Sequence, residues 1–447
     1  MKSLSPTTSN LMKLAFPCIL EQLLIVSVSV MSTIIMGHVG KNEMTAVSMV
    51  NSLVTWLQFL YLGLATGVTV IIGRLYGEEN HEGVKEATMQ SLKIALIISG
   101  SISLLGFIFS DGILNLFFSS ATPEVAKHLK IYYSYSIVSL PFIAFNYITN
   151  AAARGVGDNR LALVTNVLVN ALYTLFAYIL IFGITYFGFP TLSTHGTGIA
   201  VFAARAIGPV IGVIMIKAKK IAIFPKNLFA RAKENYIKRI FSISIYTSLE
   251  QGIYQGGAVI LQSLYLIYGA TFQAGYQIST SILGIFNAVT SGISVAITVA
   301  TTQALARHDF VGASDIFRFV KKMFFVALIP AGAFLFTFGP YISHLYSTEA
   351  DVLATAGVFC RIYGVCFCMI NYQTLAGGIL RGAGDARYIT VTSTAALWVA
   401  RILPVFILST RTSGYVALGL GIVLNFATMS LIYHFRLRKG AWLHIKV

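Results

Sequence analysis

Two carboxylate residues lie inside long apolar segments of the sequence, where an ionised group is costly. Glu21 lies in the first apolar segment, and Glu250 lies in the stretch SLEQGIYQGG. Intramembrane acids that are neither paired nor wet cost several kcal/mol, so they usually mark function. Burial raises the pKa of a carboxyl group, which lets it exchange a proton near neutral pH. The chemistry expected here is reversible binding of a proton, a sodium ion or an organic cation.

Polar and aromatic side chains accompany Glu250 in its own segment and the next. Tyr254 shares a helical stripe with Glu250, because residues four apart lie on one face. Amide, hydroxyl and aromatic groups around one acid suit an amphipathic cation, through charge, stacking and cation–π attraction. The alternative is that these groups, and the two acids themselves, only join helices by hydrogen bonds. The residues predicted to bind a cation or substrate are Glu250, Gln251, Tyr254, Gln255, Tyr276, Gln277, Thr280, Asn287, Glu21 and Gln22.

The composition places these residues in a membrane protein. The chain has 447 residues, of which 56% are hydrophobic and 11% are charged, whereas soluble domains carry about 25% charged residues. Apolar segments long enough to cross a bilayer recur along the whole length. We expect an all-α membrane protein with about twelve transmembrane helices. The expected spans include 12–37, 131–152, 238–267 and 353–379.

The placement of charge predicts the orientation of the chain. The net charge is +16, but most Lys and Arg residues lie in the segments on one side of the predicted spans. This pattern follows the positive-inside rule and predicts that both termini are cytoplasmic. We therefore expect a multi-pass protein of the plasma membrane, the inner (cytoplasmic) membrane of a bacterium. Nucleic acid is not expected as a partner, because no folded domain gathers the basic residues with a binding motif.

The two halves of the sequence share one plan. The triplet LEQ at Leu20 occurs again at Leu249, and the segment RGVGDNR from Arg154 returns as RGAGDAR from Arg381. Each half then holds six spans, so both begin on the same side of the membrane, as in a parallel repeat. We predict two six-helix bundles related by a pseudo-twofold axis and facing each other across a central cleft. The expected domains are an N-terminal lobe at 1–216, a basic cytoplasmic linker at 217–239 and a C-terminal lobe at 240–447.

The RGxGDxR segments are predicted to be structural or gating latches. Their glycines permit a tight turn, and their Asp and Arg residues can tie one loop to another. A phosphate-binding loop should follow a strand, whereas these segments follow predicted transmembrane helices. The residues assigned to the latches are Arg154, Asp158, Arg381 and Asp385.

Several segments together resemble the multidrug and toxic compound extrusion (MATE) family of transporters. They are FPCILEQL with IIMGHVG, RGVGDNR, LIFGITYFGFPTLSTHGTGIA, LEQGIYQGG, LRGAGDAR and WVARILP, and they cover nearly the full chain in order. The resemblance implies two six-helix lobes in a V shape that export organic cations or other amphiphiles in exchange for H⁺ or Na⁺. It also implies that the helix 7 acid matching Glu250 takes part in coupling and substrate binding.

This sequence departs from the family pattern in its acids. Ser32 stands where the family commonly has Asp, no acid lies near Ala177, and none lies between Val352 and Gly384. Coupling is therefore expected to depend on Glu250. We expect no cofactor and no metal site apart from Na⁺ as a coupling ion. The predicted partners are the lipid bilayer and a small organic cation, and a monomer is expected.

The residues above fit three classes of function to different degrees. A secondary active antiporter for drugs or amphipathic metabolites, working by alternating access, fits the paired bundles and the lone acids. The alternative is a flippase for a lipid-linked or polysaccharide precursor, which should have a strongly cationic cleft or added helices. An enzyme is not expected, because the sequence offers no cluster of nucleophile, metal ligands or acid–base groups.

Overall fold

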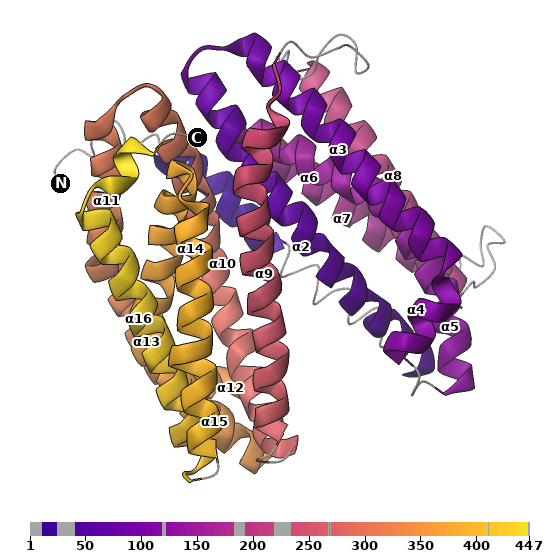
Figure 1. Ribbon diagram of the computed structural model, residues 1–447. Coiled ribbons are helices and arrows are strands. Elements are labelled where there is room, and N and C mark those ends of the chain that lie inside the picture. The colour runs from indigo at the N-terminus through magenta and orange to yellow at the C-terminus, as the bar shows by residue number, and fades with distance from the viewer. Residues whose placement is uncertain are drawn as a thin grey trace. The chain divides into compact units, whose positions relative to one another are not determined.

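The chain is helical throughout the part that the computed structural model describes (Figure 1). That part comprises residues 11–24, 41–118, 122–182, 193–218, 234–266, 268, 270–347, 349–409 and 411–445. These ranges contain helices and turns and no strand, which confirms the all-α prediction. The helical architecture follows from the apolar composition, because a helix satisfies its own backbone hydrogen bonds in a bilayer.

The helices gather into two compact units. Unit 2 comprises Leu24–Ser244, and unit 1 comprises Met1–Leu23 and Ile245–Val447. The helix at 11–24 thus belongs with the second half of the chain. It packs on Gly292, where an added Cβ would lie 2.5 Å from the backbone nitrogen of Ile19. The predicted lobes at 1–216 and 240–447 stay a prediction, and most of the predicted linker, 217–239, lies outside the described residues.

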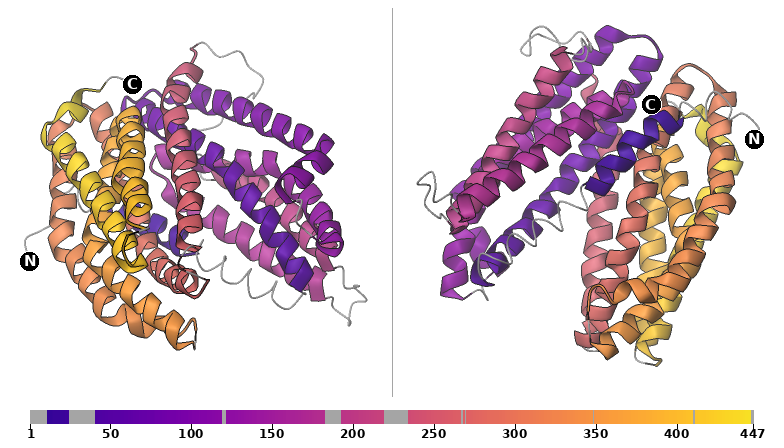
Figure 2. Two further views of the ribbon diagram at one scale, coloured as in Figure 1. Left: turned by 60° about the horizontal axis from the view of Figure 1, so that its bottom comes forward. Right: turned by 180° about the vertical axis from the view of Figure 1, so that it is seen from behind.

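Unit 2 is built around α6. This helix contacts α2, α3, α7 and α8, and the long violet and magenta helices are seen in both views of Figure 2. The start of α9 also belongs to this unit, where the Ser244 hydroxyl donates to the carbonyl of Leu64 at 3.5 Å. The helices are α2 (Lys41–Gly77), α3 (His81–Ile108), α4 (Ser110–Phe118), α5 (Pro123–Val138), α6 (Leu140–Gly155), α7 (Asn159–Phe182), α8 (Ser193–Ala218) and α9 (Ile237–Leu266).

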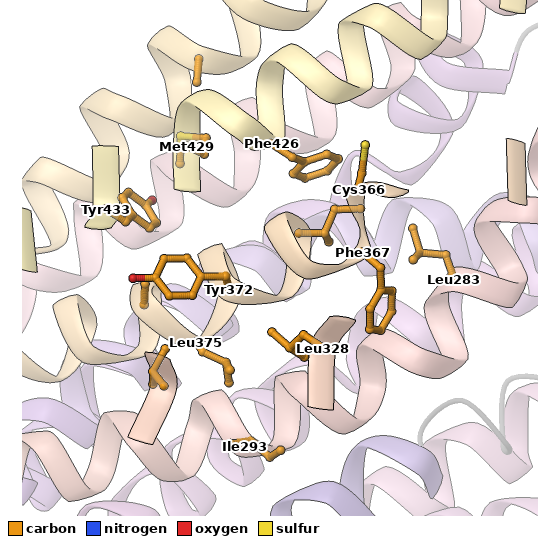
Figure 3. Close-up of a cluster of buried hydrophobic side chains, with 14 of the residues drawn as sticks. Leu283, Ile293, Leu328, Cys366, Phe367, Tyr372, Leu375, Phe426, Met429 and Tyr433 are labelled. Atoms are coloured by element: carbon orange, nitrogen blue, oxygen red, sulfur yellow. The ribbon is translucent and has the colours of Figure 1, made fainter. Parts of the chain in front are cut away.

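Unit 1 is built around α13, which contacts α10, α12 and α16. Figure 3 shows the apolar core at this position, with side chains such as Phe367, Leu375 and Phe426 between the helices. Besides the rest of α9, the elements are α10 (Ala270–Ala306), α11 (Phe310–Met323), the π-helix η2 (Phe324–Leu328), α12 (Ile329–Ser343), α13 (Ala350–Ala383), α14 (Ala386–Ala395), the π-helix η3 (Ala396–Ile402), α15 (Leu403–Ser409), α16 (Gly414–Arg438) and the short η4 (Ala441–His444).

The described residues contain nine helices that are long and apolar enough to cross a membrane, or ten when a bent pair counts as one span. Helix α9 has 30 residues but is more polar, because Glu250, Gln251 and Gln255 lie within it. The first predicted span, 12–37, is described only as a helix at 11–24.

The bent pair corrects one predicted span. The segment expected as a single helix at 131–152 is two helices, α5 and α6, which meet at 42°. Pro141 lies at the start of α6, and a proline in a helix interior removes a backbone hydrogen bond and clashes with the preceding turn. The corresponding segment of the second half has Cys368 at this position, and it forms the unbroken 34-residue helix α13.

Prolines also explain the two π-helices of unit 1. Pro330 follows η2 and Pro404 follows η3. A proline ring clashes with the carbonyl four residues earlier, which is that of Val326 in the first case and Ala400 in the second. Both carbonyls lie inside the π segments, where the wider turn gives the ring room.

Hydroxyl groups bind α10 to α13 in a regular series. Ser294, Thr298 and Thr302 donate to the carbonyl oxygens of Thr374, Gly378 and Gly382, at 2.7, 3.1 and 2.9 Å. The spacing of four on both helices keeps the donors on one face. Glycines allow the approach, since a Cβ at Gly382 would lie 2.5 Å from the carbonyl oxygen of Thr298.

The same contact occurs in unit 2, which supports the internal repeat. Thr69 donates to the carbonyl of Ala151 at 3.2 Å, and these two residues correspond to Thr298 and Gly378. The turns before α3 and α11 also match. In the first, the Asn80 side chain accepts from the backbone of Gly83, and Glu79 has a φ of 60°.

In the second turn, Asp309 accepts from Gly312 in the same way, and His308 has a φ of 56°. Left-handed backbone is uncommon for residues other than glycine. Its occurrence at both equivalent positions therefore indicates that the two halves preserve one turn geometry.

Replacing Gly382 by Ala should destabilise the protein by about 1–3 kcal/mol, because the added methyl group forces α10 and α13 apart. The measurement is the thermal unfolding midpoint of the purified protein in detergent. Gly284→Ala is the matched control, since a Cβ there meets no described atom within 4 Å. The control should match the wild type or exceed it, because Ala favours helix over Gly by about 1 kcal/mol. Equal midpoints for the two variants would contradict the close contact.

Candidate functional site

Glu250 forms an ion pair inside unit 1. Its Oε1 lies 3.0 Å from a terminal guanidinium nitrogen of Arg381, and the two side chains are 12% and 24% exposed. The carboxylate comes from the middle of α9 and the guanidinium from the last turn of α13. The pair therefore joins two helices that are far apart in the sequence and largely shields both charges from the surroundings.

Helix α9 is also held by its neighbours on either side of Glu250. The hydroxyl of Thr390 on α14 donates to the carbonyl of Tyr246 at 2.7 Å. Further along the same face of α9, Gly257 lies against the side chain of Leu397. An added Cβ at Gly257 would lie 2.6 Å from that side chain. These contacts fix the face of α9 that carries Glu250 toward the interior of unit 1.

The position of Arg381 differs from the prediction. The predicted span ends at 379 and places Arg381 in a loop, whereas α13 continues to Ala383 and holds Arg381 in its last turn. A cation is favourable there because the carbonyl end of a helix carries partial negative charge. Gly377, one turn earlier, makes room for it, since an added Cβ would lie 3.3 Å from the guanidinium and 3.5 Å from the ring of Tyr433.

A second ion pair lies beside the first. Asp385 Oδ2 is 2.9 Å from Nε of Arg436 on α16, and the guanidinium of Arg436 lies 4.6 Å from the centre of the Tyr388 ring. Gly384 between the two pairs has a φ of 86°, a conformation that glycine adopts at little cost. The RGAGDAR segment thus carries two charges that pair with different helices. Arg381 pairs with Glu250 of α9, and Asp385 pairs with Arg436 of α16.

The equivalent segment of unit 2, RGVGDNR, makes the same turn, but its aspartate, Asp158, has a different kind of partner. Gly157 has a φ of 90°, and the Asp158 side chain accepts a hydrogen bond from the backbone of Leu161 at 3.2 Å. Asp158 therefore caps the start of α7, whereas the Asp385 side chain makes no such bond at the start of α14. Arg154 lies in the last turn of α6, as Arg381 does in α13.

Tyr276 belongs to a different cluster within unit 1. Its hydroxyl accepts from the Tyr363 hydroxyl at 3.1 Å, and Arg401 donates to it at 3.5 Å. Arg401 is 7% exposed and its guanidinium lies 5.7 Å from the centre of the Phe426 ring. This cluster was not foreseen from the sequence, because its members come from α10, α13, η3 and α16.

The other residues predicted around Glu250 are less buried. Tyr254 and Gln277 are exposed, while Gln251, Gln255, Thr280 and Asn287 are half-buried. The described contacts join Glu250 to Arg381 and to none of these six. Their assignment to a binding site stays a prediction.

Glu21 lies in the helix at 11–24, where its side chain is 2% exposed. Gln22 follows it and is half-buried. Both residues belong to unit 1, together with Glu250. Ser32, the departure from the family pattern in this segment, lies outside the described residues.

Within the described ranges, no three His, Cys, Asp or Glu side chains gather as a metal-binding cluster would require. Glu250 and Asp385 each form an ion pair with an arginine. Glu250 is the one of these two acids that the sequence analysis predicts to bind a cation. A largely buried carboxylate that pairs with a guanidinium is a group that binds cations by charge.

Two helical units with nine or ten candidate membrane spans in the described residues are typical of a polytopic membrane protein. The MatE family model matches residues 17–179 and 247–407, one segment in each half. The chain therefore belongs to the MATE family of multidrug efflux transporters.

Relatives of similar length support this membership. The chain is 24% identical over 403 residues to the probable multidrug resistance protein NorM of Thermotoga maritima, covering 89% of this chain and 85% of the relative. It is 23% identical to the uncharacterized transporter YisQ of Bacillus subtilis, with 89% and 87% covered.

Solved structures show the same fold. A mutant of the Vibrio cholerae MATE transporter VcmN aligns with a TM-score of 0.88 at 15% identity, covering 99% of both chains. A transporter of the MOP superfamily from Pyrococcus furiosus, described as having a binding pocket of reversed polarity, aligns with a TM-score of 0.85 at 18% identity over 100% of both. The twelve-helix fold predicted from the sequence is thus confirmed.

A double-mutant cycle on Glu250→Gln and Arg381→Gln tests the ion pair. Each single variant should lower the thermal midpoint, because it leaves one charge in the protein interior without its partner. The double variant should lose less than the sum of the two, with an interaction energy of about 0.5–3 kcal/mol. Strictly additive losses would show that the two side chains do not interact.

Proposed function

We propose that this transporter is a secondary antiporter that exports organic cations or amphipathic metabolites in exchange for H⁺ or Na⁺, with Glu250 as the coupling carboxylate. The observation that carries the proposal is the Glu250–Arg381 pair, the two side chains being 12% and 24% exposed. Family membership supports drug export, and the pair supplies a site where a cation is already held.

The proposed mechanism is an exchange of partners on one carboxylate. Arg381 occupies Glu250 when the site is empty, so that neither charge is left unpaired in a low-dielectric region. An incoming proton, sodium ion or organic cation takes the place of the guanidinium on the carboxylate. Arg381 remains charged and is stabilised by the carbonyl end of α13.

Exchange follows from the single charge of Glu250. One carboxylate neutralises one monovalent cation at a time, so binding of the coupling ion and of the substrate compete. Such competition is a coupling free energy between the two ligands, and it acts equally in both directions. The conformational change of alternating access would then carry outward whichever cation the gradient leaves on Glu250.

The tyrosines of α16 and α14 favour a cation with aromatic or apolar surface. Tyr433 and Arg381 both border the space beside Gly377, and the guanidinium of Arg436 lies over the Tyr388 ring. An aromatic ring attracts an organic cation by about 0.5–2 kcal/mol. We assign the protein to the plasma membrane of a bacterium, with both termini cytoplasmic and a single chain as the working unit.

Glu250→Gln should reduce gradient-driven transport to the background of empty liposomes. The amide keeps the shape of the side chain but can bind neither a proton nor a cation by charge. The measurement is the movement of a fluorescent organic cation in proteoliposomes, with pH and sodium gradients imposed in separate experiments. The gradient that drives the wild type identifies the coupling ion.

Glu349→Gln is the matched control, because Glu349 is exposed and its side chain makes no helix-capping bond. It removes the same charge from the same unit and should transport like the wild type. Size-exclusion chromatography shows whether each variant is folded. A folded Glu250→Gln protein with wild-type transport would remove Glu250 from the mechanism.

The same liposomes distinguish the flippase. A fluorescent lipid-linked precursor replaces the organic cation, and its transfer between leaflets is followed without a gradient. Transfer of the lipid-linked precursor in the absence of organic-cation movement would overturn the antiporter proposal.

A further inference from the structure

Unit 1 carries a groove that the transport proposal does not use. The cavity has a volume of about 320 Å³ and lies between η2, α13 and α16, with Lys321 at the end of α11 on its edge. Its wall is formed mainly by apolar side chains, among them Phe324, Phe325, Met369 and Leu431. Neither Glu250 nor Arg381 lines it.

The groove depends on the π-helix that precedes Pro330. The wide turn of η2 presents Phe324 and Phe325 in succession at the cavity. Phe324 packs edge-on against Tyr372 of α13, with ring centres 5.5 Å apart. Phe325 is exposed. The apolar wall is therefore built into the backbone and does not arise from a single side-chain position.

One end of the groove is cationic. The Lys321 ammonium lies 4.7 Å from the centre of the Phe317 ring and pairs with no carboxylate among the described residues. His434 of α16 also lines the cavity.

His434 has a defined partner at this end of the groove. Its Nδ1 lies 2.7 Å from the Tyr372 hydroxyl. When that hydroxyl donates to Nδ1, the neutral ring carries its proton on Nε2, which is then a donor. With that tautomer, the groove offers an ammonium and an imidazole N–H at one end and hydrocarbon along the rest.

The depth of Lys321 in the membrane agrees with a groove that has one polar end and an apolar wall. The helical segment from Lys321 to Ser343 is about 33 Å long at 1.5 Å per residue, and the hydrocarbon core of a bilayer is about 30 Å thick. When Ser343 lies at one surface, Lys321 lies at the opposite one, level with lipid headgroups. The apolar wall then lies level with the acyl chains.

We propose that this groove binds one anionic phospholipid, with its phosphate on Lys321 and His434 and an acyl chain along Phe324, Phe325, Met369 and Leu431. The charge of the cationic end selects this occupant: it repels an organic cation and attracts a headgroup with net negative charge. The site is separate from Glu250 and does not rest on the antiporter mechanism.

The test is a titration of the purified full-length protein with phosphatidylglycerol, followed by native mass spectrometry. Phosphatidylcholine with the same acyl chains is the reference lipid. The wild type should bind phosphatidylglycerol first and more tightly, in one copy. Lys321→Gln should weaken that binding about fivefold, from the roughly 1 kcal/mol that a lysine contributes near anionic lipid.

Lys322→Gln is the matched control. Lys322 is the next residue, is also exposed and does not line the cavity. This substitution removes the same charge and should leave the affinity for phosphatidylglycerol unchanged. An equal loss in both variants would overturn the proposal, because it would show attraction to the general charge of the surface.

A second variant tests the apolar wall without changing charge. Ala427 lines the cavity, and Ala427→Trp should fill it and abolish binding of the first phosphatidylglycerol molecule in protein that still elutes as a folded monomer. Unchanged binding in this variant, or equal affinity of the wild type for the two lipids, would also overturn the proposal.

Discussion

The pairing of Glu250 with Arg381 is the interaction on which the charged interior of unit 1 depends. Either charge alone would be costly in a low-dielectric interior, and removing one partner leaves that cost with the other. The pair joins α9 to the end of α13 at 3.0 Å, and Asp385, four residues after Arg381, pairs with Arg436 of α16. The short turn at Gly384 thus brings α9, α13 and α16 together.

The sequence was sufficient for the class of fold and for the repeat, since both depend on patterns of many residues. Apolar length predicted the spans, and matched motifs predicted two halves of one plan. The sequence was insufficient for the Glu250–Arg381 ion pair. These two residues lie 131 positions apart, and the predicted span at 353–379 ends four residues before the end of α13. A signal was present: an acid inside a bilayer requires a partner, and an arginine in the last turn of a helix is near enough to be one.

The remaining differences arise from single residues whose effect depends on the backbone around them. Pro141 divides a predicted span into α5 and α6, while Pro330 and Pro404 leave their helices continuous and widen the preceding turns. Residue type alone does not distinguish these outcomes. The cluster of Tyr276, Tyr363 and Arg401 was likewise out of reach, because three separate helical segments supply its members.

The two halves share contacts between helix backbones but differ in the partners of their charged side chains. Their central elements also differ in stiffness. Helix α13 is continuous over 34 residues, and bending it would break backbone hydrogen bonds in hydrocarbon. Its counterpart already has a joint between Val138 and Leu140, where the chain turns by 42°. Pro141 supplies no backbone N–H beside that joint, so a bend there leaves fewer hydrogen bonds unmade than an equal bend in α13 would.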